Sequence, residues 1–275
     1  MSYFLGIDVG SVSTKLAALD ASRSLLAQAV IATRGDPLAA VSAGLAELKA
    51  QLPANEPSSV AVTGSARRLV AGHIGAGLVK NEISAQAAGG MHYFPGARCI
   101  IEIGGQDSKI ILLGGGLMTD FGMNTVCAAG TGSFLDHQAQ RLGLSPAEFG
   151  SLATASRNPV KIAGGCTVFA ESDMIHRQQS GAKLEDIIYG LCRTLAQNYL
   201  TSTAAGKEID PPVIFQGGLA RNPGMVRALE EILGFGLLIP ALPELTGAVG
   251  AALLAIEENS NSAGPAAPPE FQGVK

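Results

Sequence analysis

Tryptophan is absent from the 275 residues, and aromatic side chains make up only 5% of them. Charge is also sparse, because 15% of the residues are charged and the formal net charge is −4. A weakly acidic chain lacks the basic patches with which proteins bind nucleic acid or an anionic membrane surface. We therefore expect neither nucleic acid nor a membrane as a partner.

Long apolar runs and targeting signals are missing as well. No run approaches the roughly 18 residues that a membrane span requires, and the start, MSYFLGIDVG, has no basic n-region of a signal peptide. These features predict a cytoplasmic protein with reduced thiols. Its four cysteines, Cys99, Cys127, Cys166 and Cys192, then indicate metal binding, catalysis or burial rather than disulfides.

Glycine, in contrast, is abundant, with 35 residues. Strand-like and helix-like segments alternate along the chain, which predicts an α/β fold. Residues 5–16 (LGIDVGSVSTKL) and 101–111 (IEIGGQDSKII) share an acidic residue, glycine, a hydroxyl and a lysine in the same order. This repeat indicates two related lobes that each carry one hairpin, although two unrelated hairpins with glycine turns would give the same pattern.

The expected lobes follow from the placement of these repeats. We predict lobe I over residues 1–94, joined by a C-terminal helix at about 245–258, and lobe II, with the helices that follow the cysteines, over residues 95–244. Residues 259–275 are small, polar and rich in proline, which predicts a disordered tail.

Neither the P-loop lysine motif nor a GxGxxG fingerprint is present. Three glycine-rich strand ends occur instead, and such turns bring backbone N–H groups toward phosphates. Asp8 ends the first strand, where its carboxylate would hold Mg²⁺ through water, and Gln106 or Asp107 would orient an attacking water. The glycines of the third strand end would leave a flat shelf for adenine. The nucleotide-binding residues that we expect are Gly10, Ser11, Lys15, Gly104, Gly105, Gly217, Gly218 and Asn222.

Cys127 and Cys166 each stand among small residues just before an expected helix. A helix N-terminus stabilises a thiolate or an anionic cluster. Two ligands are half of the four that an iron–sulfur cluster usually takes, and a two-fold homodimer would supply each cysteine twice around one [4Fe–4S] cluster. The alternatives are an intrachain site that recruits Cys99 and Cys192, or burial of all four thiols as packing residues.

The segments GIDVGSVSTK, IGGQDSK, MNTVCAAGTGSFLD, CTVFAESD and GGLARNPG, in this order, resemble the ATP-dependent activators of 2-hydroxyacyl-CoA dehydratases and the ATPase subunits of benzoyl-CoA reductases (BadF/BadG/BcrA/BcrD type). The resemblance implies the fold of actin and sugar kinases: a two-lobed α/β ATPase with duplicated ribonuclease H-like lobes and the nucleotide in the cleft. The chain departs from the family at Glu102, where aspartate is usual, and at Gln86, where histidine is common.

The family also implies an activity. It predicts an oxygen-sensitive homodimer that binds ATP or ADP with Mg²⁺ and shares one [4Fe–4S] cluster through Cys127 and Cys166 of each chain. A ferredoxin- or flavodoxin-like protein would reduce this cluster, and ATP hydrolysis would drive a low-potential electron to a cluster-containing dehydratase or reductase. A small-molecule kinase of the same fold and a non-catalytic ATP-binding module are the competing hypotheses.

Overall fold

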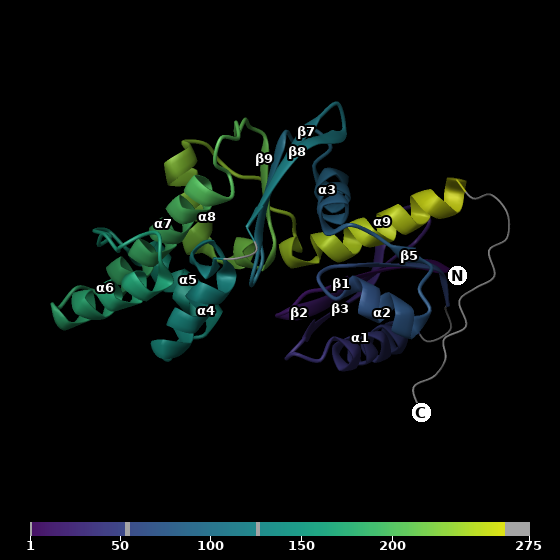
Figure 1. The fold of residues 1–275 in the computed structure, drawn as a ribbon, viewed down its shortest axis with the longest axis horizontal. Coiled ribbons are helices and arrows are strands. Elements are labelled where there is room, and N and C mark those ends of the chain that lie inside the picture. The colour runs from purple at the N-terminus through teal and green to yellow at the C-terminus, as the bar shows by residue number, and fades with distance from the viewer. Residues whose placement is uncertain (1, 53–55, 125–126, 262–275) are drawn as a thin grey trace. The chain divides into compact units, whose positions relative to one another are not determined.

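The computed structural model describes residues 2–52, 56–124 and 127–261, and the chain divides into two compact units. Unit 1 comprises residues 1–95 and 245–275, and unit 2 comprises residues 96–244 (Figure 1). Within the described ranges, no helix combines the length and the apolar character that crossing a membrane demands.

Unit 1 contains a five-stranded sheet in the order β3-β2-β1-β4-β5. The pairs β1–β2 and β2–β3 are antiparallel, whereas β1–β4 and β4–β5 are parallel. The strands are β1 (Tyr3–Val9), β2 (Ser13–Leu19), β3 (Leu25–Ala32), β4 (Pro57–Thr63) and β5 (Leu78–Val79), and the helices are α1 (Pro37–Gln51), α2 (Arg67–Ile74), α3 (Glu82–Tyr93) and α9 (Thr246–Asn261).

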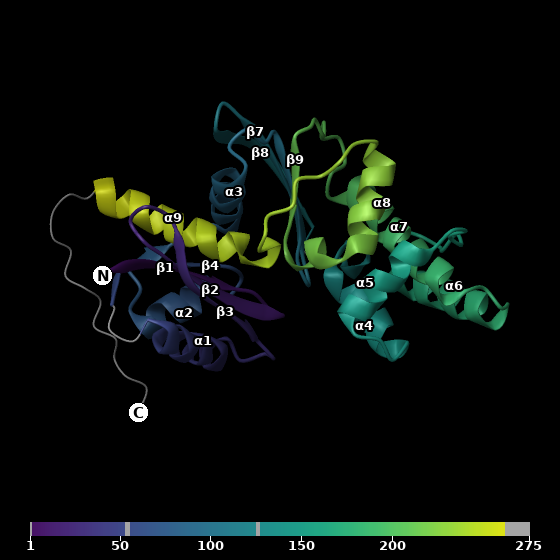
Figure 2. The same cartoon turned by 180° about the vertical axis from the view of Figure 1, so that it is seen from behind.

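The two faces of the unit 1 sheet are covered by different helices, as Figures 1 and 2 show. Because side chains alternate along a strand, Ile7 and its neighbours on one face join a core with Val41 of α1 and Val70 of α2. On the other face, a side chain at Gly6 would overlap the carbonyl of Ala248 in α9. Glycine in β1 therefore lets α9 lie directly on the sheet, on the same face as Asp8.

Unit 2 contains a four-stranded sheet in the order β8-β7-β6-β9, in which only β6–β9 is a parallel pair. The strands are β6 (Cys99–Ile103), β7 (Ser108–Gly114), β8 (Leu117–Asn124) and β9 (Val213–Gln216). The helices are α4 (Gly132–Arg141), α5 (Pro146–Ala155), α6 (Thr167–Gln179), α7 (Leu184–Ser202) and α8 (Pro223–Leu233), with the short 3₁₀ helices η1 (Ala128–Gly130), η2 (Gly218–Arg221) and η3 (Pro243–Leu245).

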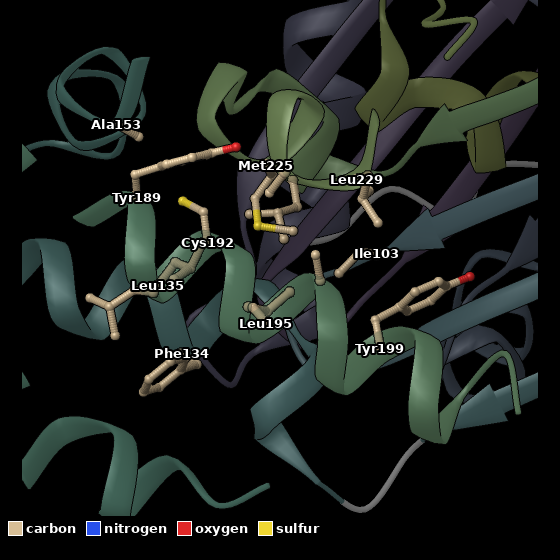
Figure 3. Packing of buried hydrophobic residues seen from close by; sticks show 14 of the residues in the cluster. Ile103, Phe134, Leu135, Ala153, Tyr189, Cys192, Leu195, Tyr199, Met225 and Leu229 are labelled. Atoms are coloured by element: carbon tan, nitrogen blue, oxygen red, sulfur yellow. The ribbon is translucent and has the colours of Figure 1, made fainter. Parts of the chain in front are cut away.

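Helix α7 forms the centre of unit 2. Its residues Tyr189, Leu195 and Tyr199 are fully buried, and they pack in one cluster with Ile103 of β6 and Met225 of α8 (Figure 3). The burial of large aromatic and aliphatic side chains along this helix makes α7 a firm support for the loops that contact it.

The expected hairpins and the helices after the cysteines are present, but the sequence does not predict strands β3, β5 and β8 or helices α2 and α5. The expected start of the tail was wrong. Helix α9 continues to Asn261, because no glycine or proline interrupts residues 257–261. The rest of the expected tail, residues 262–275, lies outside the described residues.

Candidate functional site

The first hairpin of unit 1 places Asp8 directly opposite Lys15. The Lys15 Nζ lies 3.9 Å from the Asp8 Oδ2, and Asp8 is buried. The Gly10 N–H donates to the carbonyl of Ser13 (3.2 Å) and closes the turn, while Ser11 is exposed at its tip. This hairpin therefore presents an open turn above a buried carboxylate and a lysine.

Thr33, which no motif in the sequence marks, fixes this turn. The hydroxyl of Thr33, just after β3, donates to the Gly10 carbonyl (2.7 Å) and lies 3.0 Å from the Thr14 hydroxyl. Thr33 also donates its own N–H to the Val12 carbonyl (2.9 Å). Because 23 residues separate Thr33 from Gly10, no local pattern indicates this contact.

The equivalent hairpin of unit 2 places Glu102 opposite Lys109. The Nζ of Lys109 is fully buried and lies 2.8 Å from Glu102 Oε2 and 2.9 Å from Asp107 Oδ1. The Gly104 N–H donates to the Asp107 carbonyl (3.0 Å), which closes the turn as in unit 1. Gln106 is exposed at the tip. Asp107 therefore folds back under the turn, whereas Gln106 is accessible.

Each hairpin is flanked by a glycine that follows a parallel strand. Strand β4 ends beside Asp8 and β9 ends beside Glu102, and the next residues, Gly64 and Gly217, have φ angles of 91° and 89°. A Cβ at Gly64 would lie 2.6 Å from Asp8 Oδ1, and one at Gly217 would lie 2.8 Å from Glu102 Oε1. The acid, lysine and glycine thus recur in both units, in agreement with the repeat in the sequence.

The Asp8 carboxylate lies in a cradle formed by glycine backbone and polar side chains. A Cβ at Gly247 of α9 would lie 2.6 Å from Asp8 Oδ2 and 2.8 Å from the Gln86 Nε2, and Gln86 Oε1 accepts from the Thr246 hydroxyl (3.0 Å). The hydroxyl of Thr63, beside Asp8 in the sheet, is buried without a hydrogen-bond partner among the residues that the structure describes. Carboxylate and hydroxyl oxygens are the kind of ligand that Mg²⁺ prefers, directly or through water, so the chemistry of these groups matches the expected cation.

The third glycine-rich strand end follows β9. Gly218 is exposed, and a Cβ there would meet no atom within 4 Å, so the backbone is open at this point. Asn222 has a structural role, because its Oδ1 accepts from the N–H groups of Gly224 (2.9 Å) and Met225 (3.2 Å) and caps α8. A role for Asn222 in nucleotide binding stays a prediction.

The two candidate ligand cysteines lie at the starts of helical segments. Cys127 is exposed and precedes η1 and then α4, whereas Cys166 is half-buried and is the N-cap of α6. The side chain of Asn124 holds the Cys127 backbone by donating to its carbonyl (2.9 Å) and accepting from its N–H (3.1 Å). Both thiols are free.

The other two cysteines have a different environment. Cys99 and Cys192 are fully buried in the unit 2 core, and Figure 3 shows Cys192 among apolar side chains. Burial raises the pKa of each thiol to about 12. Because only a thiolate binds iron or zinc well, this environment disfavours the intrachain site that would recruit them. Within the described part of the chain, no three cysteine, histidine or acidic residues group as metal ligands.

The glycine turn of unit 2 is joined directly to the helix that follows Cys127. The N–H groups of Gly132 and Ser133, at the start of α4, donate to the carbonyls of Gly104 and Gly105, each at 2.8 Å. A displacement of this turn therefore acts on the helix start five residues after Cys127. The sequence contains no sign of these contacts, since they join backbone atoms far apart in the chain.

Helices α4 and α6 are also linked to each other. Glu171 of α6 accepts from Arg141 (2.7 Å) and Gln138 (3.3 Å) of α4. The helices that follow the two cysteines are thus connected by a polar contact on the surface of unit 2.

Comparisons with known proteins agree on one family. The model of the BadF/BadG/BcrA/BcrD ATPase family matches residues 5–255. The 2-hydroxyisocaproyl-CoA dehydratase activator of Clostridioides difficile is 36% identical over 94% of this chain and 97% of its own length. The (R)-2-hydroxyglutaryl-CoA dehydratase activating ATPase of Acidaminococcus fermentans is 35% identical over 93% and 98%.

The fold is also similar to that of a solved structure of a dehydratase activator. The activator of the 2-hydroxyisocaproyl-CoA dehydratase from Clostridium difficile with bound ADPNP superimposes with a TM-score of 0.87 over 99% of each chain, at 34% identity. This similarity confirms the expected fold class, a two-lobed, actin-like α/β ATPase.

Proposed function

Because the chain belongs to the BadF/BadG/BcrA/BcrD ATPase family, we propose that it hydrolyses ATP to drive electron transfer to a partner dehydratase or reductase, which it thereby activates. Its relatives include a dehydratase activator and a dehydratase activating ATPase, each similar over nearly the whole chain. The observation that carries the proposal is the junction in unit 2, where the carbonyls of a glycine turn accept hydrogen bonds from the N–H groups of the helix start that follows an accessible cysteine.

The nucleotide would be bound by the glycine-rich strand ends. In this proposal the backbone N–H groups and hydroxyl at Gly10–Ser11 and the N–H groups at Gly104–Gly105 bind phosphate oxygens. Asp8 holds Mg²⁺ through water in its glycine-lined cradle, with Lys15 as a nearby cation. The strand end at Gly217 and Gly218, whose backbone is open at Gly218, receives the adenine.

The catalytic water would be oriented by Gln106 rather than by Asp107. Gln106 is exposed at the tip of the turn, whereas the Asp107 carboxylate is bound by the buried Lys109 at 2.9 Å. Asp107 would then keep the turn in shape. A Gln106→Ala variant is expected to lower kcat for ATP hydrolysis without weakening ADP binding, because Gln106 orients water rather than nucleotide.

The exposed or half-buried cysteines fit an iron–sulfur cluster. Cys127 and Cys166 from each of two chains would provide the four thiolates that a [4Fe–4S] cluster takes. When bound, the cluster supplies a one-electron carrier. The chain's own contribution would be to place both cysteines at the starts of helical segments. A ferredoxin- or flavodoxin-like protein would be the upstream donor.

The coupling between nucleotide and cluster would run through the turn of unit 2. ATP and ADP differ by one phosphate, so the backbone at Gly104–Gly105 changes its contacts when that phosphate leaves. The carbonyls of the same residues hold Gly132 and Ser133, and the start of α4 would move with them. Such a movement changes the dipoles and hydrogen bonds around the cysteines, which tune a cluster's potential.

Anaerobic quantification of iron and sulfide, together with the mass in solution, tests this proposal. We expect about four irons per two chains, complete loss in Cys127→Ala or Cys166→Ala, and retention in Cys99→Ala and Cys192→Ala. Iron loss in both core variants, with folding unchanged, would instead support the intrachain site. A wild-type protein without iron after reconstitution would overturn the electron-transfer function.

A further inference from the structure

The two cysteine-bearing loops of unit 2 are bridged by one side chain, that of Asn198 in α7. Its Nδ2 donates to the Ala129 carbonyl (3.2 Å), two residues after Cys127, and its Oδ1 accepts from the Gly165 N–H (2.9 Å), just before Cys166. The two contacts span 69 and 33 residues of sequence. A single planar amide therefore sets the separation of the loops.

The helix around Asn198 is well anchored. The neighbouring residue Tyr199 is fully buried, and its hydroxyl donates to the Lys109 carbonyl (2.9 Å) in β7. The Cys127 loop also packs against this part of α7, since a Cβ at Gly130 would lie 3.7 Å from the Tyr199 Cα. Asn198 thus lies on a helix that is anchored in the core, and its hydrogen bonds hold both cysteine loops relative to that core.

We propose that Asn198 is a positioning residue that holds the two cysteine loops at the separation at which both thiolates reach one cluster. The inference rests on the proposed function, because it concerns the cluster that Cys127 and Cys166 would share. The chemistry selects asparagine, since one end of the amide must donate and the other must accept. Asparagine at this position also transmits any shift of one loop to the other.

Substitutions can separate the two contacts. Asn198→Asp retains the acceptor for Gly165 and loses the donor to Ala129, whereas Asn198→Ala loses both. The matched control is Gln197→Ala, which changes the adjacent exposed residue of α7. Circular dichroism and the solution mass of each variant establish that it is folded before the loops are compared.

The first readout is hydrogen–deuterium exchange of the metal-free protein, which does not depend on any cluster. In Asn198→Ala we expect the peptide that contains Gly165 to exchange roughly tenfold faster, because its N–H loses its acceptor. Asn198→Asp and Gln197→Ala should keep the wild-type rate there. Wild-type exchange in Asn198→Ala would overturn the proposal.

The second readout is the release of iron from reconstituted protein to a chelator. Asn198→Ala and Asn198→Asp should lose iron about tenfold faster than wild type, since residues that orient metal ligands typically contribute this much to affinity, and Gln197→Ala should not. Wild-type release rates in both Asn198 variants would overturn the proposal. If wild-type protein binds no iron, the proposed function fails, while the exchange experiment still tests whether Asn198 holds the loops.

Discussion

In unit 1 the Asp8–Lys15 pair is 3.9 Å long and Lys15 keeps 17% of its side chain exposed, whereas in unit 2 Lys109 is fully buried and contacts Glu102 at 2.8 Å and Asp107 at 2.9 Å. The two hairpins otherwise share their register, their turn hydrogen bond and the flanking glycine. The same hairpin geometry therefore holds a partly exposed lysine in unit 1 and a fully buried, doubly paired lysine in unit 2.

The surroundings of the two hairpins suggest why they differ. The turn of unit 1 is held from outside by Thr33 and leaves its lysine partly accessible to a ligand. The hairpin of unit 2 is attached to α4 through Gly104 and Gly105 and to α7 through the Tyr199 hydroxyl. The unit 1 turn thus keeps a partly exposed lysine beside its carboxylate, whereas the unit 2 turn is tied by hydrogen bonds to two helices.

Substitution of the hairpin lysines should give the largest difference in stability between the two units. Lys109→Met leaves a buried carboxylate without its cation, so we expect the free energy of unfolding to fall by about 3–5 kcal/mol. Lys15→Met removes a longer, partly exposed contact and should cost about 1 kcal/mol. Urea unfolding followed by circular dichroism measures both values. Equal losses would contradict the view that the shorter contact and the full burial of Lys109 make the unit 2 pair the more stabilising of the two.

The glycines should instead behave alike, because their geometry is shared. Gly64→Ala and Gly217→Ala each place a Cβ against the neighbouring carboxylate at positive φ, and we expect each to cost roughly 2 kcal/mol or more. The controls Gly75→Ala and Gly206→Ala also have positive φ but no atom within 4 Å of the new Cβ, so about 1 kcal/mol is expected from strain alone. A loss confined to one unit would break the equivalence of the hairpins.

A smaller effect is expected at Thr33, whose hydroxyl holds the glycine turn of unit 1. Thr33→Val removes the donor to the Gly10 carbonyl and should cost about 1 kcal/mol. If this turn binds phosphate, ADP affinity measured by calorimetry should fall about fivefold. The control is Thr119→Val in unit 2, which removes an exposed hydrogen bond to Leu112 and should leave ADP affinity unchanged.

Local sequence patterns are sufficient to predict the hairpins and the positions of Cys127 and Cys166 before helices. The spacing of seven residues from acid to lysine recurs because it places both on one face across a short turn, and the run of small residues before each helix marked Cys127 and Cys166. In each of these cases, neighbouring residues determine the structure.

The contacts that connect the hairpins, the cysteine loops and the helices cannot be predicted from local sequence patterns. Thr33, Asn198 and the start of α4 act through hydrogen bonds to residues that the fold brings near from distant segments. Gln86 received no role from the sequence, yet it lies beside the Gly247 backbone and Asp8. The sequence predicts a role for Asn222 in nucleotide binding but not its contact with the start of α8, where its Oδ1 accepts from the backbone.

The smallest effects are expected at surface ion pairs, one in each unit. Lys80–Glu258 in unit 1 and Arg141–Glu171 in unit 2 are both 2.7 Å long and partly exposed. Lys80→Met and Arg141→Met should each lower the free energy of unfolding by only about 0.5 kcal/mol, and roughly 1 M salt should remove the difference. Both surface pairs have the same length and are partly exposed, although they lie in different units. They therefore test whether burial alone explains the different stability losses expected for Lys15→Met and Lys109→Met. If Arg141→Met were as unstable as Lys109→Met, ion pairs in unit 2 would be critical whether or not they are buried. Burial would then no longer explain the difference between Lys15→Met and Lys109→Met.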